Sequence, residues 1–541
     1  MATTTNKKLN KIPQREDIND KHKWNLIDVY DSIDSWEMDF EKVKGLIEKA
    51  KDFIGKLSKA SVLFECLETR TELSKLTSRL YLYAHLSKDL DSRLSKYQAL
   101  TDRAATLSAY AGAAFSFIEP ELLKLTDQEL MKLSNQFITA DLYDFFIKEL
   151  IRSREHIRSE EVEELLSLSA VVAKGPETIF SLLDDADLKY PVVQDENGDD
   201  IQLTKQRFAR LLDSSIPKVR RNASNAFHSV YKDHINTLNA TLSTEINKNI
   251  FYTKARRYKS CLHYSLDGDN IPETVYHSLI KTTEANLNGL NKWVSLRKKI
   301  LKLDEIMPYD MYCPLFPEKD YEVPYEQAVN NVLEAAQPLG EKYHIMLKTA
   351  FDSQWVDVYE TEGKTGGAYS WGQYGIHPFI LMNYNDTVDN MFTLAHEMGH
   401  AIHSHLSNST QPFPKAQYST FVAEVASTLN EGLLMQYLLN ITTDKEEKLY
   451  LLNRHIDNTM GTFFHQVMYA HFEWDMHKHV EKGQALSPDF LNELWIELSK
   501  KYYGPSLTLD EFSHLKWSRI PHFYSAFYVY QYATSYAASQ A

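Results

Sequence analysis

The sequence predicts a mostly helical protein with a small β patch. Apolar residues recur at three- and four-residue steps through long stretches of the chain, which is the period of an amphipathic helix. Short polar loops join these stretches, and no fixed repeat length suggests a solenoid. Two regions, residues 188–204 and 355–384, break the helical pattern and carry strand and turn signals instead.

The first third of the chain contains a series of predicted helices. Trp36, Phe40, Val43 and Ile47 form the first apolar stripe. Similar stripes recur over residues 63–86, 94–117, 129–154 and 159–173. We therefore expect a helical N-terminal lobe over residues 1–187.

A β-hairpin is expected where this helical series ends. Residues 188–193 and 201–204 are short strand-like runs, and Asn197-Gly198 between them is a strong hairpin turn signal. Long helical patterns resume afterwards. The hairpin is the candidate boundary, so that residues 188–541 form a catalytic region.

A second strand-rich patch precedes the chain's most informative motif. Residues 355–359 alternate weakly, and residues 379–384 form a short strand candidate. Pro378 suits an edge strand, and an open edge is where an extended peptide can add as a further strand. Gly366 and Gly367, in the turn between the two runs, are candidates for substrate contact; ordinary loop geometry is the alternative.

The next predicted helix carries a His-Glu-x-x-His string. The apolar period through residues 388–402 indicates the helix, with Asp386 as its expected N-cap. His396 and His400 are four residues apart and therefore share one face. Two imidazoles on one face can share a Zn²⁺ ion, with Glu397 beside them as a general base. Such a string arises by chance in roughly 1% of chains of this length.

A further helix is expected after residues 407–415, because Pro412 and Pro414 cannot continue the first one. It places Glu424 among apolar residues, where a carboxylate is costly to bury without a partner. A metal ion would supply that partner. Glu431 lies two turns further along the same face and could hydrogen-bond a ligating histidine. An exposed acid without a metal role is the alternative for both residues.

Two further groups of side chains are candidates for the site, but their sequence patterns are less specific than the His-Glu-x-x-His string. His403 and His405 lie off the metal-facing pair, so we expect them to pack or hydrogen-bond around the site. Near the C-terminus, His522 and four tyrosines fall within eleven residues. An aromatic core segment is the alternative, but a zinc site short of hydrogen-bond donors makes catalytic use plausible for the group.

Composition narrows the function classes. Hydrophobic residues make up 43% and charged residues 25%, as in soluble globular proteins, and the net charge of -15 argues against nucleic-acid or anionic-membrane partners. Cys66, Cys261 and Cys313 are few and scattered, as expected for reduced thiols. Residues 1–8 lack the apolar core of a signal peptide, and the weakly polar run 109–118 is about half of a bilayer-spanning helix. We therefore expect a cytoplasmic protein.

Several strings along the chain together carry a family resemblance. They are Lys23-Trp24-Asn-Leu, Phe115-Ser-Phe-Ile-Glu-Pro, Gly268-Asp-Asn-Ile-Pro-Glu, the His-Glu-Met-Gly-His helix, Phe421-Val-Ala-Glu424-Val-Ala-Ser-Thr, and Arg519-Ile-Pro-His522 with Phe527-Tyr-Val-Tyr530-Gln-Tyr-Ala-Thr. With them, nearly the whole chain resembles oligoendopeptidase F, a bacterial branch of the thimet-oligopeptidase family of zinc metallopeptidases. Family members continue beyond the last string, whereas this chain stops at Ala541, so a truncated or a short protein is expected.

The resemblance implies a site and a fold. It implies one zinc ion per chain bound by His396, His400 and Glu424, and Glu397 as the base. It also implies a mostly helical ellipsoid of two lobes around a deep channel that admits short peptides, with the β patch beside the zinc helix expected to be antiparallel.

The resemblance further implies that His522 and one or two of Tyr524, Tyr528 and Tyr530 face the scissile carbonyl. Tyr528 and Tyr530 lie two residues apart on one predicted helix and cannot share a face. We prefer Tyr530 as the oxyanion donor, because it matches the family's later tyrosine, and place Tyr528 second; Tyr524 is a candidate for substrate binding.

The sequence-based hypothesis is therefore a zinc-dependent endopeptidase that hydrolyses internal bonds of short, unstructured oligopeptides. A metallocarboxypeptidase of similar helical fold could use the same triad, but it would need a site for a free peptide terminus. A non-catalytic peptide-binding protein is a further alternative, against which the intact His-Glu-x-x-His string and Glu424 argue.

Overall fold

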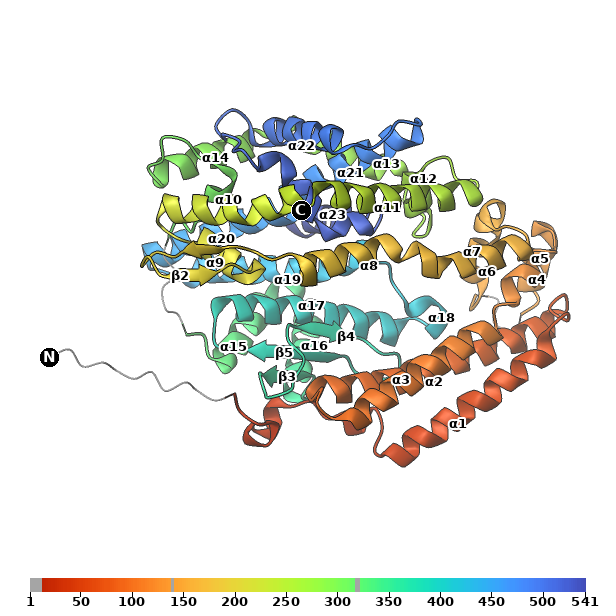
Figure 1. Cartoon of the computed structure of the whole chain (residues 1–541). Coiled ribbons are helices and arrows are strands. Elements are labelled where there is room, and N and C mark those ends of the chain that lie inside the picture. Colours follow the sequence, from red (N-terminus) through yellow and green to blue (C-terminus); the bar gives the residue numbers. More distant parts are fainter. Residues whose placement is uncertain (1–11, 138–140, 317–321) are drawn as a thin grey trace. The chain divides into compact units, whose positions relative to one another are not determined.

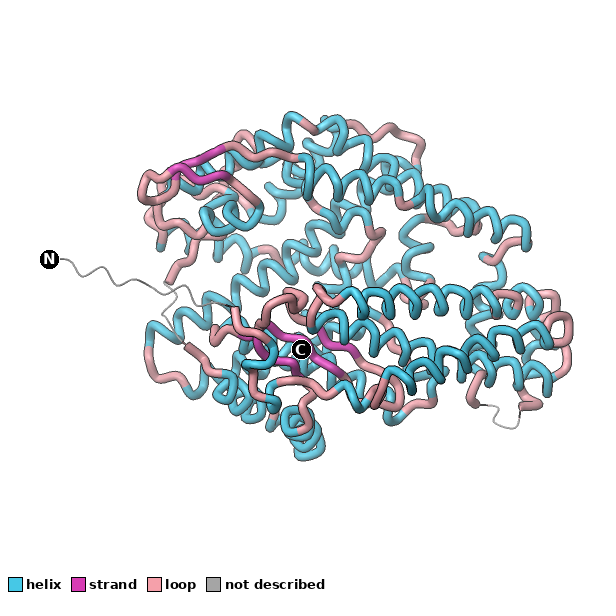
Figure 2. Tube along the Cα trace, turned by 60° about the horizontal axis from the view of Figure 1, so that its bottom comes forward, coloured by secondary structure: helices cyan, strands magenta, loops and turns pink. Residues whose placement is uncertain are grey.

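The computed structural model describes residues 12–137, 141–316 and 322–541 (Figure 1). Helices dominate the described residues, and strands are confined to small groups (Figure 2). The chain divides into two compact units, each built from two separate segments: Met1–Arg154 with Tyr321–Leu438, here unit 1, and Glu155–Asp320 with Leu439–Ala541, here unit 2. The predicted helical fold with a small β component is confirmed.

Unit 1 contains the elements on which the predicted metal motif lies. They are α1 (Ile33–Lys49), α2 (Ala60–Leu90), α3 (Ser95–Ala114), α4 (Ile118–Leu122), α5 (Asp127–Ser134), α6 (Asp144–Ser153), α15 (Tyr325–Ala335), α16 (Glu341–Asp352), β3 (Val356–Tyr359), β4 (Tyr369–Trp371), β5 (Phe379–Tyr384), α17 (Val388–Thr410), α18 (Phe413–Ala416) and α19 (Thr420–Ile441), whose last turn passes into unit 2.

Unit 2 contains the hairpin and the aromatic C-terminal segment. Its elements are α7 (Glu160–Ala173), α8 (Gly175–Leu182), β1 (Val192–Gln194), β2 (Asp200–Gln202), α9 (Lys205–Leu212), α10 (Pro217–Asp233), α11 (Ile235–Ala255), α12 (Cys261–Asp267), α13 (Glu273–Ala285), α14 (Asn288–Ile300), α20 (Lys445–Thr459), α21 (Gln466–Glu481), α22 (Pro488–Tyr503) and α23 (Tyr530–Gln540).

The N-terminal helices pack as their apolar stripes predict. Trp36 on α1 is fully buried, stacks on Phe40, and donates its indole N–H to the carbonyl of Leu80 on α2. An indole N–H that is buried needs such an acceptor, so this bond fixes how α1 lies against α2. The stripe over residues 129–154 is divided between α5 and α6 rather than forming one helix.

Both predicted strand regions are present, with two corrections. The first is an antiparallel hairpin of β1 and β2, with Gly198 at φ 84° in its turn. The second is a sheet of order β3-β5-β4, in which β3 and β5 are parallel and β4 and β5 antiparallel, so this patch is mixed and the expectation of an antiparallel one was wrong. The prediction that residues 379–384 form an edge strand was wrong: β5 is the central strand, and Pro378 precedes it, where no ladder bond is lost.

A buried ion cluster anchors this sheet to the N-terminal segment. Asp357 on β3 is 2% exposed and pairs with Arg15 and with Lys364, whose Nζ lies 2.7 Å from its carboxylate. Burial disfavours the charged carboxylate, but the two cations outweigh it, so the pKa of Asp357 is lowered. The cluster fixes the start of the Gly-rich turn that leads to β4.

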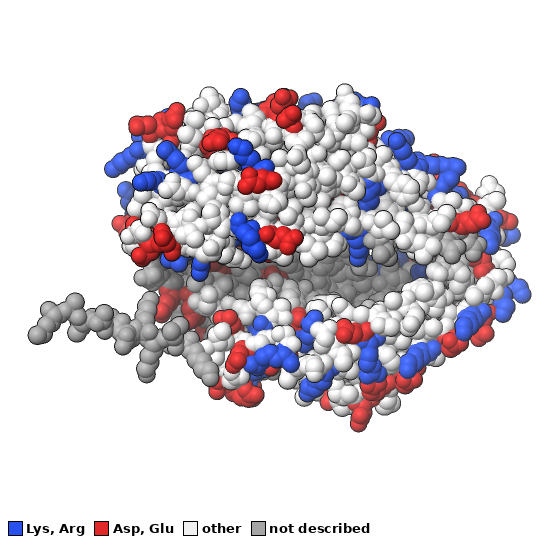
Figure 3. Space-filling model, in the orientation of Figure 1, with Lys and Arg blue, Asp and Glu red and all other residues white. Residues whose placement is uncertain are grey.

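The distribution of charged side chains on the surface does not test the predictions about nucleic-acid and membrane partners. On the face shown in Figure 3, basic side chains lie among acidic ones. By length and composition alone, one helical stretch of the described chain, Glu161–Asp187, is apolar enough to cross a membrane, and a single stretch of this kind is weak evidence. Residues 1–8, from which we expect no signal peptide, lie outside the described residues. A cytoplasmic location and the 187/188 domain boundary stay predictions.

The three cysteines are free and buried. Burial raises the pKa of the Cys66 and Cys261 thiols to about 12. Because the thiolate is the reactive form, neither residue is placed for nucleophilic chemistry.

Candidate metal centre

Two helices of unit 1 bring three potential metal ligands together. α17 carries His396 and His400 on one face, and α19 carries Glu424. The Nε2 atoms of the two histidines are 3.2 Å apart, and each lies 3.5 Å from Oε2 of Glu424. This is the one group of three such side chains within reach of a common metal ion among the described residues.

The spacing of these donor atoms fits a tetrahedral metal ion. Zinc binds histidine nitrogen and carboxylate oxygen at about 2.0–2.2 Å, so neighbouring ligands of a tetrahedral site lie about 3.4 Å apart. The three observed separations fall around this value. The observed separations therefore make a metal ion the natural occupant of the space between the three atoms.

Glycine at position 399 allows the two helices to approach so closely. A Cβ atom there would lie 2.6 Å from the carbonyl oxygen of Ala426 and 2.7 Å from the Cα of Ser427. Both are backbone atoms of α19 and cannot move aside as a flexible side chain would. Gly399 is therefore what brings Glu424 to the two histidines, and its packing role was not recognised from the sequence.

Hydrogen bonds orient the ligands. His396 donates from Nδ1 to Glu431 Oε1 at 2.5 Å, which directs its Nε2 toward the other two ligands. Burial disfavours the protonated imidazole, but Glu431 and the nearby carboxylates outweigh it and raise the pKa of His396. Glu424 accepts a hydrogen bond from the Ser427 hydroxyl at 2.9 Å. Its contact with His400, above all, lowers the pKa of Glu424 to about 2, so it is ionised at neutral pH.

Glu397 stands beside the ligand pair in a different environment. Its side chain is on α17 and the residue is only 8% exposed. Burial raises the pKa of Glu397, while the positive potential of His396 and His400 opposes the rise. A partly buried carboxylate with a raised pKa next to a metal-binding group has the properties of a general base.

The remaining predicted contributors on α17 have defined neighbours. His403 stacks on Tyr418 with ring centroids 3.9 Å apart, and Tyr418 shares a hydrogen bond with the Ser404 hydroxyl. His405 packs against Trp355. The helix is capped by Thr387, whose hydroxyl accepts from Asn390 N–H, and not by Asp386, which adopts φ 59° outside the helix.

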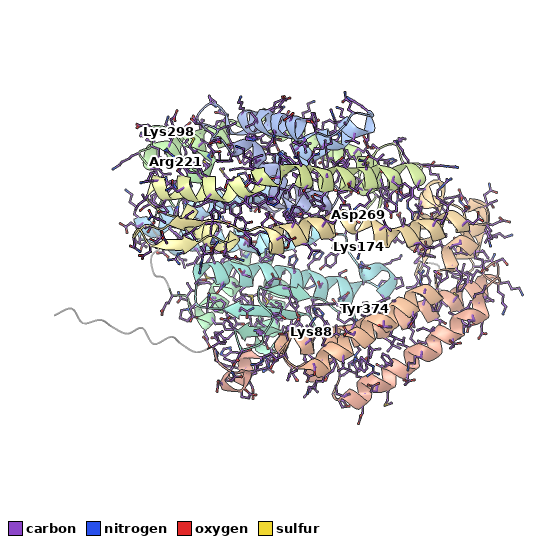
Figure 4. The ribbon with its side chains drawn as sticks, viewed as in Figure 1. Lys88, Lys174, Arg221, Asp269, Lys298 and Tyr374 are labelled. Atoms are coloured by element: carbon purple, nitrogen blue, oxygen red, sulfur yellow. The ribbon has the colours of Figure 1, made fainter. Side chains whose placement is uncertain are left out.

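A large pocket opens from the metal group within unit 1. Its volume is about 1120 Å³, and His400 is part of its lining. The lining includes Thr77, Ser78 and Tyr81 from α2, Ala105 and Ser108 from α3, Trp371 and Tyr374 beside β4, Ser404 and Asn408 from α17, and Phe413 and Tyr418 from the α18 segment. Figure 4 labels Tyr374, whose ring meets that of Phe413 edge to face and whose hydroxyl donates to the Gln411 carbonyl.

The Gly-rich turn before β4 is tied to α2 by a residue that the sequence analysis missed. Asp89 is 4% exposed and accepts hydrogen bonds from the hydroxyls of Tyr369 and Thr365. Asn383 on β5 donates to the carbonyl of Gly367. Gly366 and Gly367 thus lie in a turn held from both sides, and their contact with substrate stays a prediction. Asp89 lies far away in sequence, so no local pattern could have identified it.

The aromatic segment lies in unit 2 and is less regular than predicted. Tyr528 precedes α23, and the helix begins at Tyr530, so the argument from one shared helix was wrong. Tyr530 is 1% exposed, with its ring 5.1 Å from that of Tyr276. His522 and Tyr528 are half-buried. Burial lowers the pKa of His522, so its imidazole is neutral at pH 7.

Buried contacts pin this segment. Glu473 on α21 is fully buried and accepts from the N–H of Phe527, which has a left-handed φ of 52°. Ser265 donates to the Ala526 carbonyl, and Tyr524 shares a hydrogen bond with Thr241 while stacking on Phe180. Tyr524 therefore packs inside unit 2, and its contact with substrate stays a prediction.

Tyr532 joins the half-buried group and was not singled out from the sequence. Its hydroxyl donates to that of Tyr528 at 3.3 Å, and its ring lies 6.1 Å from that of His522. The signal was present: Tyr528 and Tyr532 are four residues apart, a spacing that brings side chains together.

Comparison with known proteins agrees with this geometry. Residues 210–541 match the profile of peptidase family M3, and residues 121–190 match that described as Oligopeptidase F. The chain is 41% identical to Oligopeptidase PepF of Bacillus subtilis over 99% of its own length and 80% of the relative's. It is 36% identical to Group B oligopeptidase PepB of Streptococcus agalactiae, over 97% and 87% of the two chains.

Solved structures show the same fold. Oligoendopeptidase-F from Enterococcus faecium superimposes with a TM-score of 0.70 at 32% identity, covering 93% of this chain and 86% of that one. A protein of Chlamydophila abortus gives a TM-score of 0.90 at 32% identity, covering 97% and 88%. The chain therefore belongs to peptidase family M3 and is a metalloendopeptidase.

Proposed function

We propose that this protein is a zinc-dependent oligoendopeptidase that hydrolyses internal bonds of short, unstructured peptides. The observation that carries the proposal is the set of three donor atoms, two imidazole nitrogens and one carboxylate oxygen, at tetrahedral spacing in a chain of peptidase family M3. The names of the relatives, oligopeptidase and oligoendopeptidase, support peptides as substrates.

In this proposal His396, His400 and Glu424 hold one zinc ion per chain. Three protein ligands leave the fourth position open, as in catalytic zinc sites. When bound, the ion would supply a Lewis acid that polarises the scissile carbonyl and lowers the pKa of a water molecule. Glu431 keeps the His396 ring oriented through their hydrogen bond.

Glu397 is the general base. Its carboxylate takes a proton from the attacking water and passes it to the leaving amine. Its burial suits both steps, because a raised pKa makes the carboxylate a stronger base and its acid form readily available.

In this proposal the aromatic C-terminal segment supplies hydrogen-bond donors to the developing oxyanion. His522, Tyr528 and Tyr530 are the candidates, and burial favours Tyr528 over Tyr530, reversing the order preferred from the sequence. Such a donor strengthens as negative charge develops, so its effect falls on the transition state.

Cleavage of internal bonds fits the pocket better than removal of a terminal residue does. A carboxypeptidase needs a cation or backbone donors for the free carboxylate, and no Lys or Arg is among the residues that line the pocket in the described chain. A purely binding protein would have no use for a buried carboxylate beside a metal group.

Substitution of Glu397 by Gln tests the catalytic proposal. The amide keeps the shape of the side chain but cannot accept the proton, so the turnover rate should fall at least ~10²-fold while zinc stays near one per chain. Glu341→Gln, the same change on the exposed start of α16, is the matched control. A Glu397→Gln protein with near-normal turnover would remove the base assignment.

Cleavage mapping tests the substrate class. Peptides acetylated at one end and amidated at the other should be cut internally, because no free terminus is required. Folded proteins at the same enzyme concentration should remain intact. Cleavage restricted to peptides with a free C-terminus would instead identify a carboxypeptidase.

A further inference from the structure

A cavity of about 40 Å³ in unit 2 is rich in hydrogen-bond donors. About 10–15 Å³ suffices for one water molecule, so this space holds one small ion or a few waters. The polar side chains of its lining are Tyr312, His465, Tyr469, Ser499, Tyr503, Ser513 and Lys516. No Asp or Glu is among the lining residues of the described chain. The cavity therefore presents N–H and O–H groups around a positive charge.

Lys516 supplies this charge, and its ammonium makes no hydrogen bond or ion pair within the described chain. Burial lowers the pKa of Lys516, and the positive charge of Arg519 acts in the same direction. Arg519 lies over the ring of Phe227, 5.6 Å from its centroid. Both cations are half-buried, so each repels the other in surroundings that screen charge less than water does. An anion beside them would relieve this repulsion.

Asp510 is an acid that attracts the Lys516 ammonium, but it stands outside the lining. Its carboxylate accepts from the Ser513 hydroxyl at 2.8 Å and from the Phe512 N–H at 3.0 Å. These bonds direct one carboxylate oxygen toward its own turn. The interior of the cavity is thus left with a cation and without an acid.

The other donors meet around the cavity. His465 ends a π-helical turn, Met460–His465, and such turns are frequent at functional sites. Its ring stacks on that of Tyr469, with centroids 6.3 Å apart, and lies 5.8 Å from that of Tyr503. Burial, and then the charge of Lys516, lower the pKa of His465 to about 4. The imidazole is therefore neutral at pH 7 and has one N–H to donate.

We propose that this cavity binds one small monovalent anion, with chloride as the representative ion, and that the bound anion holds the segment carrying His522 in place. The second half of the inference rests on the proposed function, in which His522 is a candidate oxyanion donor. An anion in the cavity gives Lys516 the charge partner that it lacks and accepts from the phenol and imidazole groups. The small volume favours a monatomic ion over a phosphate ester or a peptide terminus.

The cavity is joined to His522 along the chain and through aromatic rings. Lys516 lies on the short helix Ser513–Arg519, and the next one, Pro521–Tyr524, carries His522. Phe523 packs against Tyr469 of the lining, with ring centroids 6.2 Å apart. An anion that fixes Lys516 and Tyr469 therefore restrains both neighbours of the segment.

Bromide tests occupancy without any need for activity. Crystals of the wild-type holoenzyme soaked in sodium bromide should show an anomalous peak in the cavity, next to the Lys516 ammonium. Crystals of Lys516→Met should lack this peak and keep any bromide bound at the surface. A wild-type cavity without bromide overturns the proposal, and this outcome does not depend on whether the variant folds.

Peptide hydrolysis tests the link to His522. For an end-blocked peptide, kcat should be about 5-fold or more higher in sodium chloride than in sodium gluconate at equal ionic strength, and it should saturate with chloride. Lys516→Met should lose this dependence and keep its zinc. Lys232→Met is the matched control, because Lys232 is an exposed lysine of the same unit whose ammonium lies over the Phe512 ring. It should keep the chloride dependence of the wild type.

The outcomes separate the two halves of the proposal. Equal rates in both salts, with bromide in the cavity, overturn the link to His522. A chloride dependence that Lys516→Met retains places the responsible anion elsewhere and overturns the site. No hydrolysis in either salt contradicts the proposed function instead, while the bromide peak still decides whether the cavity binds an anion.

Discussion

The metal centre of unit 1 and the aromatic segment of unit 2 are built in different ways. The proposed metal ligands stand on two regular helices, and their positions follow from i, i+4 spacing and from one close helix contact at Gly399. The aromatic segment runs through turns, and its hydrogen bonds with Glu473, Ser265 and Thr241 on other helices hold it in place.

This difference teaches which part of a site tolerates change. A helical ligand pair is fixed by many backbone hydrogen bonds, so substitution of a ligand removes a function without moving its neighbours. A turn held by single side-chain contacts depends on each of them.

Removal of a metal ligand should have the largest effect. Glu424→Ala and His400→Ala should each lose most of the bound zinc and at least ~10³-fold in kcat/KM, because two protein ligands do not hold zinc. Zinc analysis and circular dichroism separate metal loss from unfolding. If Glu424→Ala kept both its zinc and its activity, α19 would contribute no ligand.

Removal of one phenolic oxygen should have the next largest effect. Tyr528→Phe should lower kcat by ~10- to 10³-fold with little change in KM or zinc content, since the hydroxyl acts in the transition state. Tyr530→Phe, buried against Tyr276, should be milder. A larger loss for Tyr530→Phe would restore the order preferred from the sequence.

Weakening the hydrogen bond that orients the His396 ring should have a smaller effect on activity. Glu431→Gln keeps an acceptor for the Nδ1 proton but removes the charge, so zinc affinity should fall by about 10- to 100-fold while kcat at saturating zinc changes little. Competition with a chelator measures this affinity. Unchanged zinc affinity would make Glu431 a packing residue.

Filling the helix contact with a methyl group should act mainly on stability. Gly399→Ala places a methyl group against the α19 backbone and should cost about 1–3 kcal/mol in unfolding free energy. Gly45→Ala on α1, where a Cβ meets nothing within 4 Å, should instead stabilise by roughly 0.5–1 kcal/mol. Denaturant unfolding of the two variants provides the comparison, and equal shifts would contradict a tight contact at Gly399.

The same comparison explains what could be predicted from the sequence. The shared face of His396 and His400 follows from their four-residue spacing, and Glu424 was added because its carboxylate lies among apolar residues; the structure brings these three side chains together. The order of the strands in the sheet could not be predicted from the sequence. Pro378 is compatible with an edge strand, but it is equally compatible with the position just before a central strand, which is where it lies.

Contacts between distant segments were beyond the reach of local patterns. Asp89 meets Thr365 and Tyr369 across more than 270 residues of chain. Tyr528 was predicted to share a helix with Tyr530, whereas the buried carboxylate of Glu473 accepts from the Phe527 N–H and holds a turn before that helix. Tertiary contacts of this kind override local propensity.

The close approach of α17 and α19 at Gly399 also determines which ions the site can hold. Donor atoms preset about 3.4 Å apart suit a small ion with four short bonds. Ca²⁺ requires six to eight oxygen ligands at about 2.3–2.6 Å, and Mg²⁺ requires an octahedron of oxygens. Two imidazoles on α17, with a carboxylate held against them by α19, therefore favour an ion of zinc's size and ligand preference over Ca²⁺ and Mg²⁺.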